Sequence, residues 1–131
     1  MAETATIGAG ELEGLIASAL IASRTAEVNA RSVARALAQA EIDGQKGHGI
    51  SRVPIYAAQA RAGKVDGHAT PVARQTQPGS LMIDVANGFA FPAVSKPKID
   101  ELSSADVFES APGQWSPTGL HVGISASRTA N

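Results

Sequence analysis

The chain has 131 residues, a length typical of one domain that can bury a hydrophobic core. With 11 Lys and Arg against 12 Asp and Glu, its formal net charge is −1, which gives no reason to expect nucleic acid or an acidic membrane as a partner. Because cysteine is absent, disulfides, thiolate catalysis and Cys-based zinc sites are excluded.

No stretch of the chain approaches the roughly twenty apolar residues of a membrane span, and the first residues show no basic segment followed by an apolar run. We therefore expect a cytoplasmic protein with no membrane contact. Aromatic residues are few, with 3 Phe, 1 Tyr and 1 Trp. The core must then consist of Ala, Val, Ile and Leu, which suits helices packed closely through alanine faces.

Residues 1–10 are small and polar and are expected to be flexible. Their glycines, with Gly14, resemble a dinucleotide-binding loop. That motif requires Gly-x-Gly-x-x-Gly between a strand and a helix, whereas here the last spacing is one residue too long and no strand precedes it. The chain therefore has no such loop at this point.

Three helices are predicted over residues 11–66. The first covers 11–23, with Leu12, Leu15, Ile16, Ala19 and Leu20 on its inner face. The second has Thr25 as N-cap and ends at Gly44, and its inner stripe is Ala26, Ala30, Val33, Leu37 and Ala40. The third has Ser51 as N-cap, Pro54 in its first turn and Gly63 as its stop.

Beyond residue 66 the apolar period changes, and 67–105 is predicted to start an α/β domain. Val72–Thr76 and Leu81–Val85 favour a β-hairpin, Asn87 and Gly88 a turn, and Pro92 the start of a helix that Pro97 should kink or shorten. Residues 106–131 contain repeated Pro and Gly and predict an irregular or disordered tail. The fold class is thus α/β, or α+β within this chain: three helices, then a short hairpin or partial mixed sheet, a helix and a tail.

The loop between the second and third helices is the candidate site. It reads Asp43-Gly44-Gln45-Lys46-Gly47-His48-Gly49-Ile50-Ser51-Arg52. Histidine exchanges protons near neutral pH, so His48 is the candidate general acid or base. Arg52 would lie on the same side if the segment from Gly49 were helical, and could hold a carboxylate. The alternatives are a helix cap at Gly44 followed by a connector with an incidental histidine, and an Arg52 that pairs with a surface carboxylate.

Two other site types are disfavoured. Asp43, His48 and Ser51 have the residue types of a hydrolase catalytic triad, which we call the hydrolase trio, but the sequence shows no nucleophile elbow or oxyanion donor to go with them. A metal site from His48, His68 and His121 is disfavoured because the three are far apart in sequence and no acidic partner stands at ligand spacing. We expect no metal.

One run of the chain reads Ala40-Glu41-Ile42-Asp43-Gly44-Gln45-Lys46-Gly47-His48-Gly49-Ile50-Ser51-Arg52-Val53-Pro54-Ile55-Tyr56 and is followed by Gly63-Lys64-Val65. It resembles the malate/L-lactate dehydrogenase-like oxidoreductase family. In sequence, this run together with Tyr56-Ala-Ala-Gln-Ala-Arg61 is most similar to the Δ1-piperideine-2-carboxylate/Δ1-pyrroline-2-carboxylate reductases of that family. Ile83–Ala90 resembles the family's next block, and the likeness covers roughly residues 12–102.

The resemblance implies reduction of a 2-keto acid or cyclic 2-imino acid with NADH or NADPH. His48 matches the family's proton donor, and Arg52 is matched to the substrate carboxylate. The resemblance also implies a non-Rossmann α/β fold and a homodimer with active sites between subunits. It does not identify cofactor-binding residues.

The family's cofactor-binding segments have no counterpart in this sequence, and the likeness ends after about Ala105. We therefore expect a truncated or frame-shifted product, an N-terminal part without reductase activity of its own, since a proton donor without a hydride source cannot complete the reaction. The alternative function is a small helical protein-interaction module in which His48 is structural.

Overall fold

A computed structural model describes residues 3–77, 80–94 and 121–125. The chain divides into two compact units, Met1–His68 and Ala69–Asn131. Within the described ranges, every helix is too short or too polar to cross a lipid bilayer.

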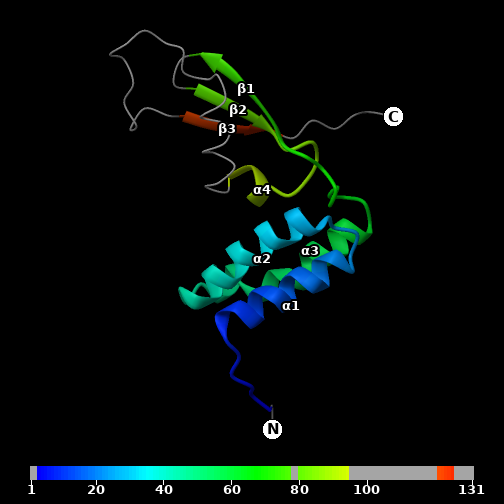
Figure 1. The fold of residues 1–131 in the computed structure, drawn as a ribbon, viewed down its shortest axis with the longest axis vertical. Coiled ribbons are helices and arrows are strands. Elements are labelled where there is room, and N and C mark those ends of the chain that lie inside the picture. Colours follow the sequence, from blue (N-terminus) through cyan, green and yellow to red (C-terminus); the bar gives the residue numbers. More distant parts are fainter. Residues whose placement is uncertain (1–2, 78–79, 95–120, 126–131) are drawn as a thin grey trace. The chain divides into compact units, whose positions relative to one another are not determined.

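The first unit contains three α-helices, α1 (Ala9–Ile21), α2 (Glu27–Ile42) and α3 (Val53–Arg61), with the 3-10 turns η1 (Lys46–His48) and η2 (Ile50–Arg52) between α2 and α3. Helix α1 packs against both α2 and α3 (Figure 1). The buried apolar side chains of this unit are small or aliphatic, as the composition predicts: Ile16, Ala17, Leu20, Ala30, Val33, Ala34, Leu37, Ala38 and Ala60.

The inner face of α2 is largely as predicted, and that of α1 is so only in part, with Ile16 and Leu20 buried. Ala30, Val33 and Leu37 are buried. On α1, Leu15 is 57% exposed, and Ala17 is buried instead. The apolar stripe of α1 is wider than the surface that α2 and α3 cover, so the packing decides which apolar residues remain outside.

Glycine ends α2, as the sequence predicts. Gly44 has φ +78°, a left-handed conformation that glycine adopts without steric cost. Its N–H donates to the Glu41 carbonyl at 3.1 Å, and the Gln45 N–H donates to the Ala40 carbonyl at 2.8 Å. These two bonds form a Schellman cap, and Gly63 ends α3 by the same pair of bonds.

Thr25 is not the N-cap of α2, contrary to the prediction. The N-cap is Ala26, without a side-chain cap. The Gly67 carbonyl accepts hydrogen bonds from the Ala26 N–H at 3.0 Å and from Asn29 Nδ2 at 2.9 Å. The Thr25 hydroxyl is buried and has no hydrogen-bond partner among the described residues. A connector distant in sequence therefore takes part in capping, which a local pattern does not reveal.

Ser51 is likewise not the N-cap of α3. It lies in η2, and the cap position belongs to Arg52. The Ser51 hydroxyl donates instead to the Lys46 carbonyl at 2.8 Å, across the loop. Pro54 occupies the first turn of α3 as predicted, where its missing N–H breaks no helix bond.

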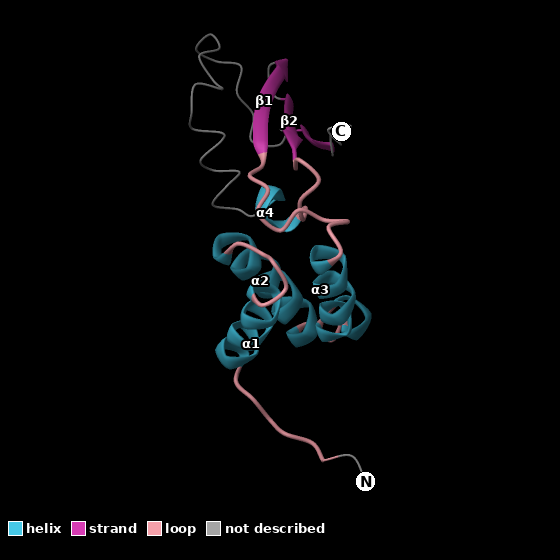
Figure 2. Ribbon diagram, turned by 90° about the vertical axis from the view of Figure 1, so that its right-hand side faces the viewer, coloured by secondary structure: helices cyan, strands magenta, loops and turns pink. Residues whose placement is uncertain are grey.

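The second unit contains a three-stranded sheet in the order β1-β2-β3. β1 (Val72–Gln77) and β2 (Ser80–Asp84) form the predicted antiparallel hairpin (Figure 2), and β3 (His121–Ser125) pairs with β2 in parallel. The short helix α4 (Phe91–Val94) follows the turn at Asn87 and Gly88. A small core joins the sheet to α4, made by Ile83, Val85 and Ala93 with Ala73 beside it.

The strand β3 corrects the prediction of an irregular tail over 106–131. The strand carries only two β-branched residues, Val122 and Ile124, which is too short a pattern to identify locally. It is stabilised by non-local pairing, with Leu81 opposite Val122 and Ile83 opposite Ile124. The other tail residues and Pro97 lie outside the described ranges.

Candidate functional site

His48 lies at the end of η1, on the loop of residues 44–52 that we call the His48 loop. The side chain is exposed, and its backbone N–H donates to the Gln45 carbonyl at 2.8 Å. In the part of the chain that the structure describes, the imidazole has no hydrogen-bond partner. The backbone at His48 is thus held while its ring faces solvent, where an external ligand can reach it.

The Arg52 side chain turns back toward the residue before His48. Its Nε donates to the Gly47 carbonyl at 2.6 Å, and its backbone N–H donates to the Gly49 carbonyl at 3.0 Å. The condition set for that placement, a helical segment from Gly49, is met only from Ile50 on, where η2 begins, because Gly49 itself has φ −99° and ψ −128°. A side-chain hydrogen bond, not helical spacing, brings the guanidinium to the His48 loop.

Within the described residues, Arg52 forms no ion pair with a carboxylate. Besides the Nε–H that donates to the Gly47 carbonyl, the guanidinium therefore has further N–H groups that can donate to a ligand. A planar guanidinium can bind a carboxylate through two parallel hydrogen bonds. The His48 loop thus carries a titratable ring and a permanent cation four residues apart.

Glu41 is a residue of this site to which the sequence patterns assigned no role. It lies in the last turn of α2, and its Oε2 accepts the Ile50 N–H at 3.1 Å while its Oε1 accepts from Lys46 Nζ at 3.2 Å. The Ile50 hydrogen bond, followed by that from Lys46, lowers the pKa of Glu41. The helix dipole disfavours a carboxylate at a helix C-terminus. The position of Glu41 in the last turn of the predicted helix was therefore the sequence feature that could have indicated compensating partners.

The hydrolase trio does not form. Ser51 Oγ donates to the Lys46 carbonyl, and Asp43 Oδ1 accepts from Gln39 Nε2 at 2.9 Å. Among the residues that the structure describes, no group of three His, Asp or Glu side chains could hold one metal ion. The candidate chemistry of the loop therefore remains with His48 and Arg52.

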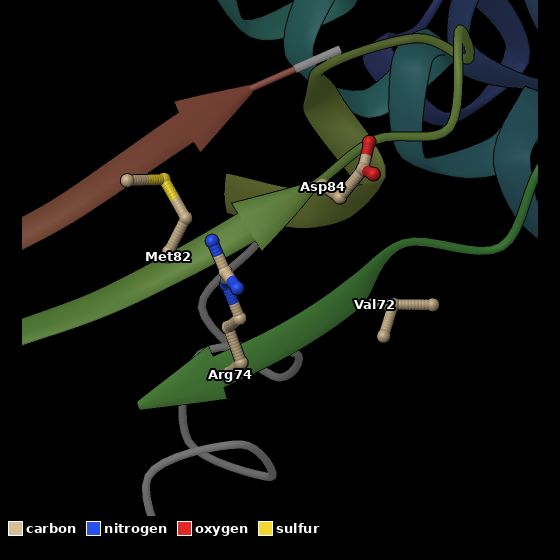
Figure 3. A pocket seen from close by; sticks show the side chains of 4 residues that line it. All are labelled: Val72, Arg74, Met82 and Asp84. Carbon is tan, nitrogen blue, oxygen red and sulfur yellow. The ribbon is translucent and has the colours of Figure 1, made fainter. Parts of the chain in front are cut away.

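A pocket of about 470 Å³ lies on one face of the hairpin, lined by Val72, Arg74, Met82 and Asp84 (Figure 3). The register explains the grouping, because Val72 pairs with Asp84 and Arg74 with Met82. The pocket belongs to the second unit and includes no residue of the His48 loop. The described residues of the His48 loop are mostly exposed.

Comparison with known proteins places this loop in a family. The family described as malate/L-lactate dehydrogenase matches residues 7–100. A (2R)-3-sulfolactate dehydrogenase (NADP(+)) of Chromohalobacter salexigens is 45% identical over 87 residues, which are 66% of this chain and 26% of that protein. A Δ1-pyrroline-2-carboxylate/Δ1-piperideine-2-carboxylate reductase of Pseudomonas putida is 36% identical over 85 residues, 65% of this chain and 25% of that protein.

The fold agrees with the sequence comparison. The crystal structure of Δ1-piperideine-2-carboxylate reductase from Pseudomonas syringae pv. tomato superposes with a TM-score of 0.69 and 33% identity, covering 78% of this chain and 32% of that one. The chain spans about a quarter of the length of the curated relatives it matches. Because the family match extends over most of the described residues, including the His48 loop, the chain belongs to the malate/L-lactate dehydrogenase family.

Proposed function

We propose that this chain supplies the proton-donating loop of a nicotinamide-dependent oxidoreductase that reduces 2-keto acids or cyclic 2-imino acids. The observation that carries the proposal is the His48 loop itself, where an exposed imidazole stands on an internally hydrogen-bonded backbone beside the Arg52 guanidinium. The names of the relatives support the substrate class, since they include reductases of cyclic imino acids and a dehydrogenase of a 2-hydroxy acid.

In the proposed reaction, protonated His48 gives its proton to the carbonyl oxygen or imine nitrogen, which gains an electron pair as the adjacent carbon is reduced. Arg52 binds the substrate carboxylate through the guanidinium N–H groups that Gly47 does not occupy. NADH or NADPH would supply the hydride.

A chimera tests the role of His48. The matching N-terminal segment of the Pseudomonas syringae reductase is replaced by residues 7–68 of this chain, and reduction of Δ1-piperideine-2-carboxylate by NADPH is followed optically. We expect His48→Gln to lower kcat by about 10²–10⁴-fold, the usual contribution of a general acid. The matched control is His68→Gln, because His68 is also exposed and lies outside the loop. A fully active His48→Gln chimera would make His48 structural and favour the helical interaction module.

The same chimera tests Arg52. Arg52→Lys keeps the positive charge but loses the planar fork, so KM for the imino acid should rise while kcat falls less. The control is Arg31→Lys, an exposed arginine that pairs with Glu27 on α2. If the two variants behave alike, Arg52 does not bind the substrate carboxylate.

We also propose that these 131 residues do not catalyse the reaction by themselves. The proposal is supported by the share of the relatives that the chain spans and by the exposure of the His48 loop. Purified chain mixed with NADPH and Δ1-piperideine-2-carboxylate should show no turnover above buffer. Turnover that His48→Ala abolishes would refute this proposal and at the same time support the role of His48.

The remaining expectations are proposed for the whole protein. The resemblance supports a homodimer with a non-Rossmann fold. The sequence pattern supports a cytoplasmic location, a helical region over 11–66 and an α/β domain beginning within 67–105. The antiparallel pairing of β1 with β2 supports the fold proposal, because Rossmann sheets are mostly parallel. Sedimentation of the intact enzyme tests the dimer.

A further inference from the structure

The Glu41 carboxylate contacts the His48 loop at residues before and after His48 in the sequence. Its Oε1 accepts from Lys46 Nζ at 3.2 Å, and its Oε2 accepts the Ile50 N–H at 3.1 Å. Lys46 stands two residues before His48 and Ile50 two residues after it. One side chain of α2 therefore ties together the two ends of the segment that carries His48.

The backbone next to His48 packs directly on Glu41. Gly49 is buried, and a Cβ placed on it would collide with Glu41 Oε2 and lie 3.1 Å from Glu41 Cβ and 3.2 Å from Glu41 Cα. Only glycine allows this approach without movement. The contact fixes the distance between α2 and the peptide that follows His48, so the loop and the carboxylate form one packed unit.

We propose that Glu41 is the positioning residue of the His48 loop: its ionised carboxylate, bonded to the Ile50 N–H and the Lys46 ammonium, holds the backbone that presents the imidazole. The consequence for catalysis rests on the proposed function of His48. The structural role of Glu41 does not, because it follows from contacts within the loop.

The charges around Glu41 agree with this role. The titratable or charged side chains on η1 and η2, which pack against the end of α2, are Lys46, His48 and Arg52. Of these, Lys46 forms the ion pair. The hydrogen bond from Ile50 and then that from Lys46 keep the pKa of Glu41 below its ordinary value, so the carboxylate is ionised wherever a histidine works as a proton donor.

The test uses the full 131-residue chain and nuclear magnetic resonance. An amide proton that donates to a carboxylate shifts when the carboxylate is protonated, so the Ile50 amide shift should titrate together with the Glu41 carboxyl carbon. Glu41→Gln keeps a neutral acceptor and should remove this titration. Glu41→Ala removes the acceptor and should speed hydrogen exchange of the Ile50 amide by roughly fivefold or more, the equivalent of one ordinary hydrogen bond.

The matched control is Glu27→Gln, since Glu27 is an exposed carboxylate on the same helix that pairs with Arg31. It should leave the amides of residues 46–52 unchanged. Core resonances of Leu37 report whether each variant is folded. An Ile50 amide that does not titrate with Glu41, or loop amides that Glu41→Gln and Glu41→Ala leave unchanged, would overturn the proposal.

The catalytic consequence is read in the chimera described above. Glu41→Gln should lower kcat more than it raises KM for the imino acid, because Glu41 contacts Lys46 and Ile50 on either side of His48, whereas the hydrogen bonds of Arg52 to Gly47 and Gly49 do not involve Glu41. If His48→Gln has no effect there but Ile50 still titrates with Glu41, the proposed function fails and the positioning role stands. If His48→Gln is inactive and Ile50 does not titrate, only the positioning role fails.

Discussion

Gly67→Ala should destabilise the helical unit, because Gly67 lies against the backbone of the α1–α2 turn. A Cβ at this position would collide with the Arg24 carbonyl oxygen and lie 2.7 Å from Thr25 Cα and 2.8 Å from Thr25 Oγ1. Two of these three atoms belong to the backbone, so no rotation of a side chain can relieve the overlap. The connector must move away from α2.

The magnitude follows from two destabilising effects and one stabilising effect. Inserting a methyl group into a packed site costs about 1–3 kcal/mol. The movement also strains the hydrogen bonds that the Gly67 carbonyl accepts from Ala26 and Asn29, each worth about 1 kcal/mol. Replacing Gly by Ala returns about 0.4–1 kcal/mol by restricting the unfolded chain. We expect a net loss of about 1–3 kcal/mol.

Urea denaturation followed by circular dichroism measures this loss, because the helical signal comes mainly from the first unit. The matched control is Gly14→Ala, where a Cβ meets nothing within 4 Å and the residue lies inside α1. That substitution should stabilise the chain by about 0.5–1 kcal/mol. If Gly67→Ala is neutral or stabilising like Gly14→Ala, the reasoning from close backbone packing is refuted.

Three further predictions concern helix ends, core and pH. Gly44→Ala should lower the free energy of unfolding in urea by about 1–2 kcal/mol, because φ at Gly44 is +78°. Steric overlap is not the cause, since no atom lies within 4 Å of the added Cβ. The control is Gly47→Ala, which is equally open but has no positive φ and should be nearly neutral. Leu37→Ala should cost about 2–5 kcal/mol and Leu15→Ala less than about 1 kcal/mol, since Leu37 is 1% and Leu15 57% exposed; equal losses would contradict the described core. Because the pKa of Glu41 is lowered in the folded chain, its contribution to loop stability is complete above its ordinary pKa of 4.5 and is lost as pH falls through the lowered value. Hydrogen exchange of the Ile50 amide, corrected for intrinsic rates, should become faster over this pH range. Corrected exchange that does not depend on pH would contradict the prediction.

The sequence by itself determined much of the secondary structure and the family. Gly44 and Gly63 end their helices because only glycine readily takes the left-handed conformation that the cap requires. The hairpin follows from two short β-favouring runs, Val72–Thr76 and Leu81–Val85, which are separated in the sequence by Gln77, Pro78 and Gly79. The resemblance to the malate/L-lactate dehydrogenase-like family is confirmed by the family match over residues 7–100.

The tertiary structure alone decided how the elements are capped and what holds His48. Thr25 and Ser51 were wrong as N-caps because a distant carbonyl at Gly67 and a carbonyl at Lys46 supply partners that local patterns do not contain. β3 depends on pairing with β2 across many residues. Glu41 meets Lys46 and Ile50 only after the Gly44 cap folds the chain back on α2. These contacts therefore depend on the conformation of the loop, and no helical or strand period in the sequence indicates them.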